Sequence, residues 1–208
     1  MTPNEQVDRA LARGRVYGFL RRVFTHEVDE PLLEWCREQD RAGLWSGLGM
    51  DLEQALDTAD GAGLEDLAID FCQLFITSGA HGVPHESVQG GALDGGDLLF
   101  GDAASAVKHL YREAGFELEE EAHLLPDALG VEFEFMERLA QAEAEARRKG
   151  DAEELTRLEG LQRRMLDDHL GRWVPGYARR MKADAGTDFY RAMLDLAADF
   201  VEWSSCET

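Results

Sequence analysis

Three short stretches of the chain carry acidic, hydroxyl and imidazole side chains at spacings that could support chemistry. They are residues 84–87 (Pro-His-Glu-Ser), Asp127 with Glu132, and the pair Asp168-His169. A carboxylate beside a histidine or serine suggests acid–base or nucleophilic catalysis, so a hydrolase acting through the first or third stretch is one hypothesis. Adjacent residues of a helix point about 100° apart, however, so Asp168 cannot orient His169 as a triad carboxylate does. The sequence also lacks a GxSxG motif, and we predict no enzymatic activity.

Metal and phosphate chemistry are also poorly supported. His81 and His85 are four residues apart, but the glycine and proline between them disfavour a helical pair of ligands, and HExxH is absent. The glycine-rich stretch 89–101 lacks both GxxxxGK[ST] and GxGxxG. Asp94 and Asp97 would place negative charge where the phosphates of a nucleotide would lie. We therefore predict no bound metal and no cofactor.

Apolar side chains precede the first polar stretch. Phe71, Leu74 and Phe75 are spaced i, i+3 and i+4, which places them on one face of a helix. Packing in the core is the simplest interpretation, and the wall of an apolar groove is the other. Close by, Pro84 restricts the backbone while Glu86 and Ser87 offer an anion and a hydroxyl, although Ser87 could instead cap a helix.

The second polar stretch coincides with the start of a helix. Pro126-Asp127 is a natural helix start, where the Asp127 side chain could cap the helix, and Glu132 and Glu134 follow within two turns. Carboxylates at the rim of an apolar groove would pair bidentately with arginine guanidinium groups. Together the two stretches predict a site for a basic, apolar peptide.

The overall charge agrees with such a ligand. The chain has 21 basic and 42 acidic residues among 208, for a formal net charge of −21. Nucleic acid is an unsuitable partner because its binding requires clustered cations, whereas a cationic ligand is favoured in both encounter rate and selectivity. The alternative is that the acidity serves solubility alone.

Apolar periodicity predicts an all-α fold, a single helical domain of about nine or ten helices spanning residues 1–208. One helix is expected from Val7 to Phe24, one from Glu30-Pro31, and one from Leu64 to about Thr77 after the break at 61–63. Further helices are expected over 129–140, over 155–166 with a break before Gly171 and Pro175, and from a cap at Thr187. Strand patterns are nearly absent.

Two regions interrupt the helices. The glycine-rich stretch 89–101 is predicted to be a long loop, and long loops in compact domains are often functional. Residues 142–154 are highly charged, and Lys149-Gly150-Asp151 is expected to turn the chain between two antiparallel helices.

The sequence also bears on location. No signal peptide and no apolar run of about 18 residues are present, which predicts a cytoplasmic protein without stable membrane insertion. Cys36, Cys72 and Cys206 are odd in number and scattered, so reduced thiols are expected. Both a monomer and a domain-swapped homodimer fit the sequence.

At the residues of the two stretches the chain resembles the TorD/DmsD group of redox enzyme maturation chaperones. The first matching pattern comprises Phe71, Leu74, Phe75, Gly79, Pro84, Glu86 and Ser87. The second is residues 125–130 (Leu-Pro-Asp-Ala-Leu-Gly), followed by Glu134-Phe135. Further similarity lies in Asp168-His169-Leu170 with Trp173 and Pro175, and in Tyr111 with residues 114–116, so that the resemblance runs from about residue 10 to 203. Ala128 stands where the family usually has histidine, and Phe71 stands where tyrosine is common.

The resemblance implies an all-helical cytoplasmic chaperone that is not an enzyme. Its partners would be the twin-arginine signal peptide and the apo form of a molybdopterin oxidoreductase, which it would hold until cofactor insertion is complete and export can begin. Asp127, Glu86 and Glu132 would recognise arginine, and Asp168, His169 and Trp173 would belong to the same peptide site. A helical scaffold or assembly subunit that binds a folded partner and ignores signal peptides is the alternative.

Overall fold

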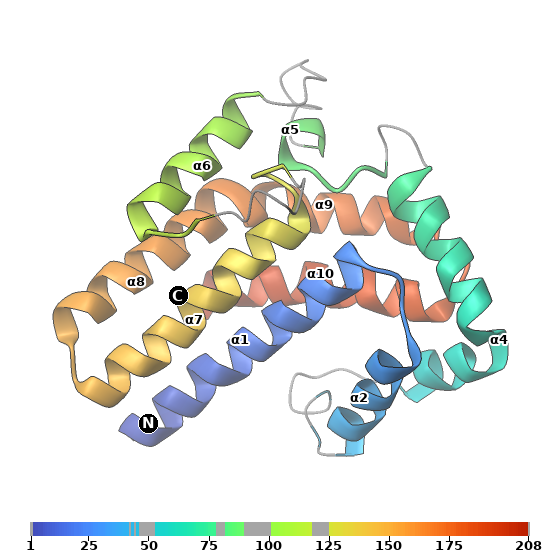
Figure 1. Ribbon diagram of the computed structural model, residues 1–208, viewed down its shortest axis with the longest axis horizontal. Coiled ribbons are helices and arrows are strands. Elements are labelled where there is room, and N and C mark those ends of the chain that lie inside the picture. The colour runs from blue at the N-terminus through green and yellow to red at the C-terminus, as the bar shows by residue number, and fades with distance from the viewer. Residues whose placement is uncertain are drawn as a thin grey trace.

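The computed structural model describes residues 2–41, 43, 45, 53–77, 82–89, 101–117 and 125–207 of the chain. All regular structure in these ranges is helical (Figure 1), apart from one isolated antiparallel bridge between His85 and Ala128. The all-α class predicted from the sequence is confirmed. Gly79, His81 and nearly all of the glycine-rich stretch 89–101 lie outside the described residues.

Helices α1 (Pro3–Thr25) and α7 (Leu129–Lys149) form the central pair of the fold and lie side by side (Figure 1). α1 begins with a capping box, in which Thr2 accepts a hydrogen bond from the Glu5 backbone N–H and the Glu5 side chain accepts one from Thr2. Gly130 allows close packing, because a Cβ at this position would collide with the Thr25 side chain. Part of the apolar periodicity of both segments therefore reflects the interface between these two helices.

The turn between α7 and α8 (Ala152–Met165) falls inside the charged range 142–154. Gly150 adopts a left-handed conformation with φ of 69°, which glycine tolerates without steric cost. Asp151 then caps α8 by accepting a hydrogen bond from the Glu154 N–H at 3.0 Å. The two helices run antiparallel and in contact (Figure 1).

The chain does not break after α8, contrary to the sequence-based expectation. A π-helical segment, Leu166–Leu170, leads directly into α9 (Gly171–Lys182), and Pro175 lies inside that helix. A Cβ at position 171 would come within 2.5 Å of the Leu166 carbonyl oxygen, so Gly171 permits the close backbone approach at this junction. The wider π-turn thus joins the helices where a glycine and a proline suggested an end.

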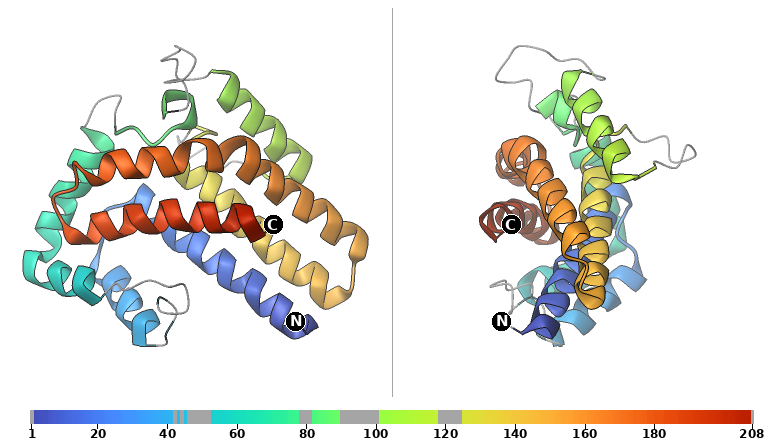
Figure 2. Two further views of the ribbon diagram at one scale, coloured as in Figure 1. Left: turned by 180° about the vertical axis from the view of Figure 1, so that it is seen from behind. Right: turned by 90° about the vertical axis from the view of Figure 1, so that its left-hand side faces the viewer.

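Helix α10 (Asp188–Glu207) packs against α9, and these two helices lie on the opposite side of the molecule from α7 (Figure 2). Thr187 caps α10 by accepting a hydrogen bond from the Tyr190 N–H at 3.3 Å, as predicted. Tyr17 of α1 meets Phe200 of α10 edge to face, with ring centroids 4.8 Å apart. The apolar core therefore extends from α1 and α7 on one side of the molecule to α9 and α10 on the other.

Helices α2 (Glu30–Arg41) and α4 (Glu53–Phe71) form one end of the molecule (Figures 1 and 2). α4 bends at Gly63, which has φ of 75°, and continues through a π-helical segment, Cys72–Ile76, to Thr77. The predicted break near residues 61–63 and the end near Thr77 are both confirmed. The one-turn helix α5 (Glu86–Gln89) and α6 (Asp102–Ala114) cover the start of α7 (Figure 1).

Candidate functional site

The polar side chains best suited to binding or catalysis lie where α5, the start of α7 and the junction before α9 come together. Five of them form what we call the carboxylate cluster: Glu86, Asp127, Glu132, His169 and Trp173. All five side chains are buried, with exposed fractions between 0% and 7%. Charged groups so deeply buried require hydrogen-bond partners, and each member of the cluster has at least one.

Glu86 connects two parts of the chain that are far apart in sequence. Its backbone N–H donates to the Asp127 carbonyl oxygen at 2.9 Å, while its side-chain Oε2 lies 2.9 Å from Nδ1 of His169. Both side chains are about a tenth exposed, so the pair reaches the surface of the protein. Glu86 thereby joins α5 both to the segment before α7 and to the π-turn before α9.

Asp127 does not cap its own helix, which excludes one of the two roles that the sequence left open. Ala128 occupies the cap position of α7 without a side-chain hydrogen bond, whereas Asp127 Oδ2 accepts the backbone N–H of Ser87 at 2.9 Å. His85 Nδ1 lies 3.8 Å from the other carboxylate oxygen. Burial favours the neutral acid, but the nearby His85 imidazole and the hydrogen bond from the Ser87 N–H outweigh it and hold the pKa of Asp127 below its usual 3.8. Asp127 is therefore an ionised anchor for α5.

Glu132 occupies the most enclosed position in the cluster. Its Oε2 accepts a hydrogen bond from the Trp173 indole N–H at 3.2 Å, and the residue is 0% exposed. Burial, followed by the negative charge of Glu86, raises the pKa of Glu132 well above its usual 4.5. The pKa values of two neighbouring carboxyl groups are thus shifted in opposite directions, that of Asp127 downward and that of Glu132 upward.

Backbone and tyrosine hydrogen bonds hold the segments of the cluster in register. The Leu129 N–H donates to the Pro84 carbonyl at 2.9 Å, beside the bridge formed by His85 and Ala128. The Tyr111 hydroxyl donates to the Pro126 carbonyl at 2.9 Å, and the Tyr177 hydroxyl donates to the Gly82 carbonyl at 2.8 Å. Ala128 therefore lies within this backbone contact.

The predicted apolar residues face the core. Leu74 is 1% exposed, Phe75 packs edge to face on Phe24 at 5.4 Å and on Tyr190 at 5.7 Å, and Phe71 contacts Phe75. These contacts are those of core packing, the simpler of the two interpretations of their spacing. The residues support the site by locking α4 onto α1 and α10.

The structure brings together most, but not all, of the predicted polar residues. Ser87 is buried beside Asp127, and Trp173 and His169 lie within the carboxylate cluster. Asp168 is exposed instead, and its carboxylate accepts a hydrogen bond from Arg172 at 3.3 Å. The adjacent residues Asp168 and His169 therefore point to different environments, as expected for neighbours on a helix.

Asp70 has a role that the sequence analysis missed. Its carboxylate accepts hydrogen bonds from the Gly186 N–H at 3.0 Å, the Thr187 N–H at 2.9 Å and the Thr187 hydroxyl at 2.7 Å. The residue is 2% exposed, so α4 provides a buried cap for α10. The only indication of this role in the sequence is that Asp70 directly precedes Phe71, the first residue of the first matching pattern.

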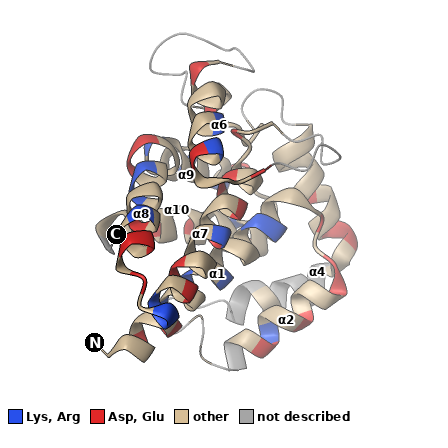
Figure 3. Ribbon diagram, turned by 60° about the vertical axis from the view of Figure 1, so that its left-hand side comes forward, with Lys and Arg blue, Asp and Glu red and all other residues tan. Residues whose placement is uncertain are grey.

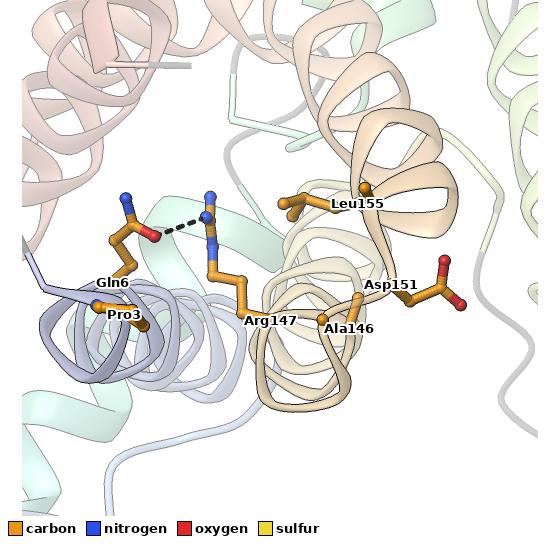
Figure 4. Close-up of a pocket in the computed structure, with 8 residues that line it drawn as sticks. Pro3, Gln6, Ala146, Arg147, Asp151 and Leu155 are labelled. Atoms are coloured by element: carbon orange, nitrogen blue, oxygen red, sulfur yellow. Dashed lines mark hydrogen bonds between the residues drawn. The ribbon is translucent and has the colours of Figure 1, made fainter.

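Among the described residues, two surface hollows lie away from the carboxylate cluster. Figure 4 shows the first, of about 180 Å³, where Gln6 of α1 accepts a hydrogen bond from Arg147 of α7 at 3.3 Å. The second, of about 170 Å³, is lined by Phe116, Phe135 and Leu158, with Arg138 stacked on Phe116. Both are smaller than pockets that enclose a drug-sized ligand, which typically measure about 300–1,000 Å³.

Within the described ranges, no three histidine, cysteine or carboxylate side chains are grouped so that they could hold a metal ion. None of the helices described has the length and apolar character required to cross a lipid bilayer.

Comparison with known proteins gives a consistent picture. Residues 42–179 match the family model described as the nitrate reductase delta subunit. The chaperone protein TorD of Photobacterium profundum is 28% identical over 204 residues, which cover 91% of each chain. The perchlorate reductase assembly chaperone protein of Dechloromonas aromatica is 28% identical over 218 residues, covering 95% of this chain and 90% of its own. The TorD chaperone of Vibrio parahaemolyticus is 25% identical over 93% of both chains. No solved structure matches.

Proposed function

The chain belongs to the nitrate reductase delta subunit family, and from that premise we propose that it is a maturation chaperone for a molybdopterin oxidoreductase. It binds the twin-arginine signal peptide and the apo form of this client in the cytoplasm, assists cofactor insertion and delays export until maturation is complete. The names of its relatives support the chaperone class, since two of them are called chaperone protein TorD and the third is called a perchlorate reductase assembly chaperone protein.

One observation carries the proposal for the peptide site. Ser87 and Asp127 are 40 residues apart in sequence, yet they share a buried hydrogen bond of 2.9 Å that joins the two motif-bearing segments. The two motifs on which the resemblance rests therefore lie next to each other in the fold. On a chain with a net charge of −21, that place concentrates three carboxyl groups, those of Glu86, Asp127 and Glu132.

Glu86 is the carboxylate best placed to receive an arginine. Its side chain is about a tenth exposed, whereas Asp127 and Glu132 are fully buried. A guanidinium group would exchange with His169 as the partner of Glu86 and gain a bidentate, charge-assisted hydrogen bond. Asp168, exposed beside His169, would lie at the rim, and the buried carboxylates would hold α5 and the helix junction in position.

Calorimetry with two synthetic leader peptides tests the proposal. The first peptide carries consecutive arginines before an apolar stretch, and the second carries lysines in their place. We expect the lysine peptide to bind more weakly by about 1–3 kcal/mol, because lysine cannot form the bidentate pair. Equal affinity for both peptides, or no binding of either, contradicts the proposal.

A matched pair of variants tests whether Glu86 is the residue that recognises arginine. Glu86→Gln is expected to remove most of the difference between the arginine and lysine peptides, because it removes the anion that distinguishes them. Glu153→Gln on the exposed face of α8 also removes one negative charge but should leave the difference intact. If both variants behave alike, general acidity and not Glu86 is responsible.

A further inference from the structure

An apolar strip lies exposed on the outer face of α4 and of the π-helical segment that follows it. Ile69 is 47% exposed and Ile76 is 65% exposed, with the half-buried Cys72 between them. We call these three residues the isoleucine strip. Ile69 and Ile76 are seven residues apart, about two helical turns, which places them on one face, and large apolar side chains grouped on an exposed face can form a binding surface.

The strip cannot turn inward, because the residues on the opposite face of the same helix are packed in the core. Phe71 and Phe75 pack on Tyr190 and Phe24 in the core, and Asp70 caps α10 through three hydrogen bonds. Rotating the helix to bury Ile69 and Ile76 would break all of these contacts. The exposure of the strip is therefore a fixed feature of the fold.

The surroundings of the strip are negatively charged. Glu65 and Asp66 lie exposed one turn before Ile69, and the Glu27 carboxylate is 3.9 Å from the Cys72 sulfur. Figure 3 shows acidic and no basic residues on α4. The sequence has no lysine or arginine between Arg41 and Lys108, although that stretch contains eleven acidic residues.

Arg22, a basic group of the adjacent helix α1, is already paired with acceptors of its own. Arg22 pairs with Asp29 at 2.8 Å and donates to the carbonyl oxygens of His26 and Glu27. Its charge is thus largely balanced, and the field over the strip remains negative. An apolar surface bordered by carboxylates is complementary to an apolar segment flanked by basic residues.

We propose that the isoleucine strip docks the apolar stretch of the leader peptide whose arginines pair at Glu86. This inference rests on the proposed function and adds a second contact surface to it. Ten residues separate Ile76 from Glu86, so the chain limits their separation to about 35 Å at full extension. An extended leader of about ten residues or more can span that distance.

Affinity measurements on one double variant test the inference. Ile69→Ser with Ile76→Ser removes the apolar surface without changing any charge, and both side chains are exposed, so the fold should persist. We expect the full leader peptide to bind about tenfold more weakly. A shorter peptide that retains the arginines but lacks the apolar stretch should bind the variant and the unmodified protein equally. Trp203→Gln, at an exposed aromatic of α10, should change neither affinity.

The cysteines provide an independent readout in the unmodified protein. Cys72 lies within the strip, Cys206 is exposed near the end of α10, and Cys36 is buried with its pKa raised to about 12, which makes it inert. Bound leader peptide should slow alkylation of Cys72 and leave that of Cys206 unchanged. If the leader binds but neither the double variant nor Cys72 alkylation responds, the strip is not the docking surface. If no peptide binds at all, the proposed function itself fails.

Discussion

Nδ1 of His169 lies 2.9 Å from Oε2 of Glu86, although 83 residues separate the two in sequence. This contact joins the one-turn helix α5 to the π-turn that precedes α9. A helix of four residues is too short to be stable alone, so its position depends on such partners. The pair is therefore both a structural tie and the most accessible part of the carboxylate cluster.

A double-mutant cycle measures the strength of this tie. Glu86→Gln and His169→Gln each remove one member of the pair, and we expect a coupling free energy of about 1 kcal/mol between them. Urea unfolding of the four proteins at pH 6 provides the measurement. Strictly additive effects would show that the contact contributes nothing to stability.

Glu132 should make stability depend on pH in a specific direction. Its pKa is raised in the folded protein, so between about 4.5 and that raised value the folded state holds a proton that the unfolded chain releases. Its stabilising contribution is complete below about 4.5 and is lost as pH rises through the folded-state pKa. We expect the free energy of unfolding of Glu132→Gln to fall less steeply than that of the unmodified protein between pH 5 and 8.

Urea unfolding across that pH range provides the comparison. Glu153→Gln, at an exposed position of α8, is the control for the loss of one charge and should retain the pH dependence of the unmodified protein. An unchanged slope in Glu132→Gln would show that Glu132 titrates alike in the folded and unfolded states.

Two glycine substitutions should have opposite effects on stability. Gly130→Ala places a Cβ against the Thr25 side chain and should cost about 1–3 kcal/mol by forcing α7 away from α1. Gly160→Ala lies in α8 with no atom within 4 Å of the added Cβ, and it should stabilise the helix by about 0.5–1 kcal/mol. Thermal unfolding of both variants tests this contrast, which would be refuted if they shifted the melting temperature in the same direction.

Asp70 should control the start of α10. Asp70→Ala removes an acceptor for three hydrogen bonds and is expected to cost about 2 kcal/mol, near the upper end for a helix cap. Hydrogen exchange should accelerate first at the amides of residues 186–190. Asp66→Ala, exposed on the same helix, is the control and should leave these amides protected. Uniform acceleration throughout the protein would indicate global destabilisation and not the loss of a cap.

The sequence alone determined the fold class and the family resemblance. Apolar spacing near 3.6 residues and local caps such as Thr187 depend on neighbouring residues only, so the all-α class and the start of α10 were predicted correctly. The resemblance is confirmed by the family model that matches residues 42–179 together with the relatives that are named as chaperones.

Only the tertiary structure decided how the polar residues are paired. The sequence left Asp127 open as a cap of the helix that follows it or as part of the peptide site. Its carboxylate in fact accepts a hydrogen bond from the Ser87 N–H, since a side chain at a helix start can point toward either segment. Helix periodicity placed Phe71 and Phe75 on one face without specifying whether that face meets the core or a ligand. Burial depends on which helices pack against it, here α1 and α10, and this is a property of contacts between residues distant in sequence.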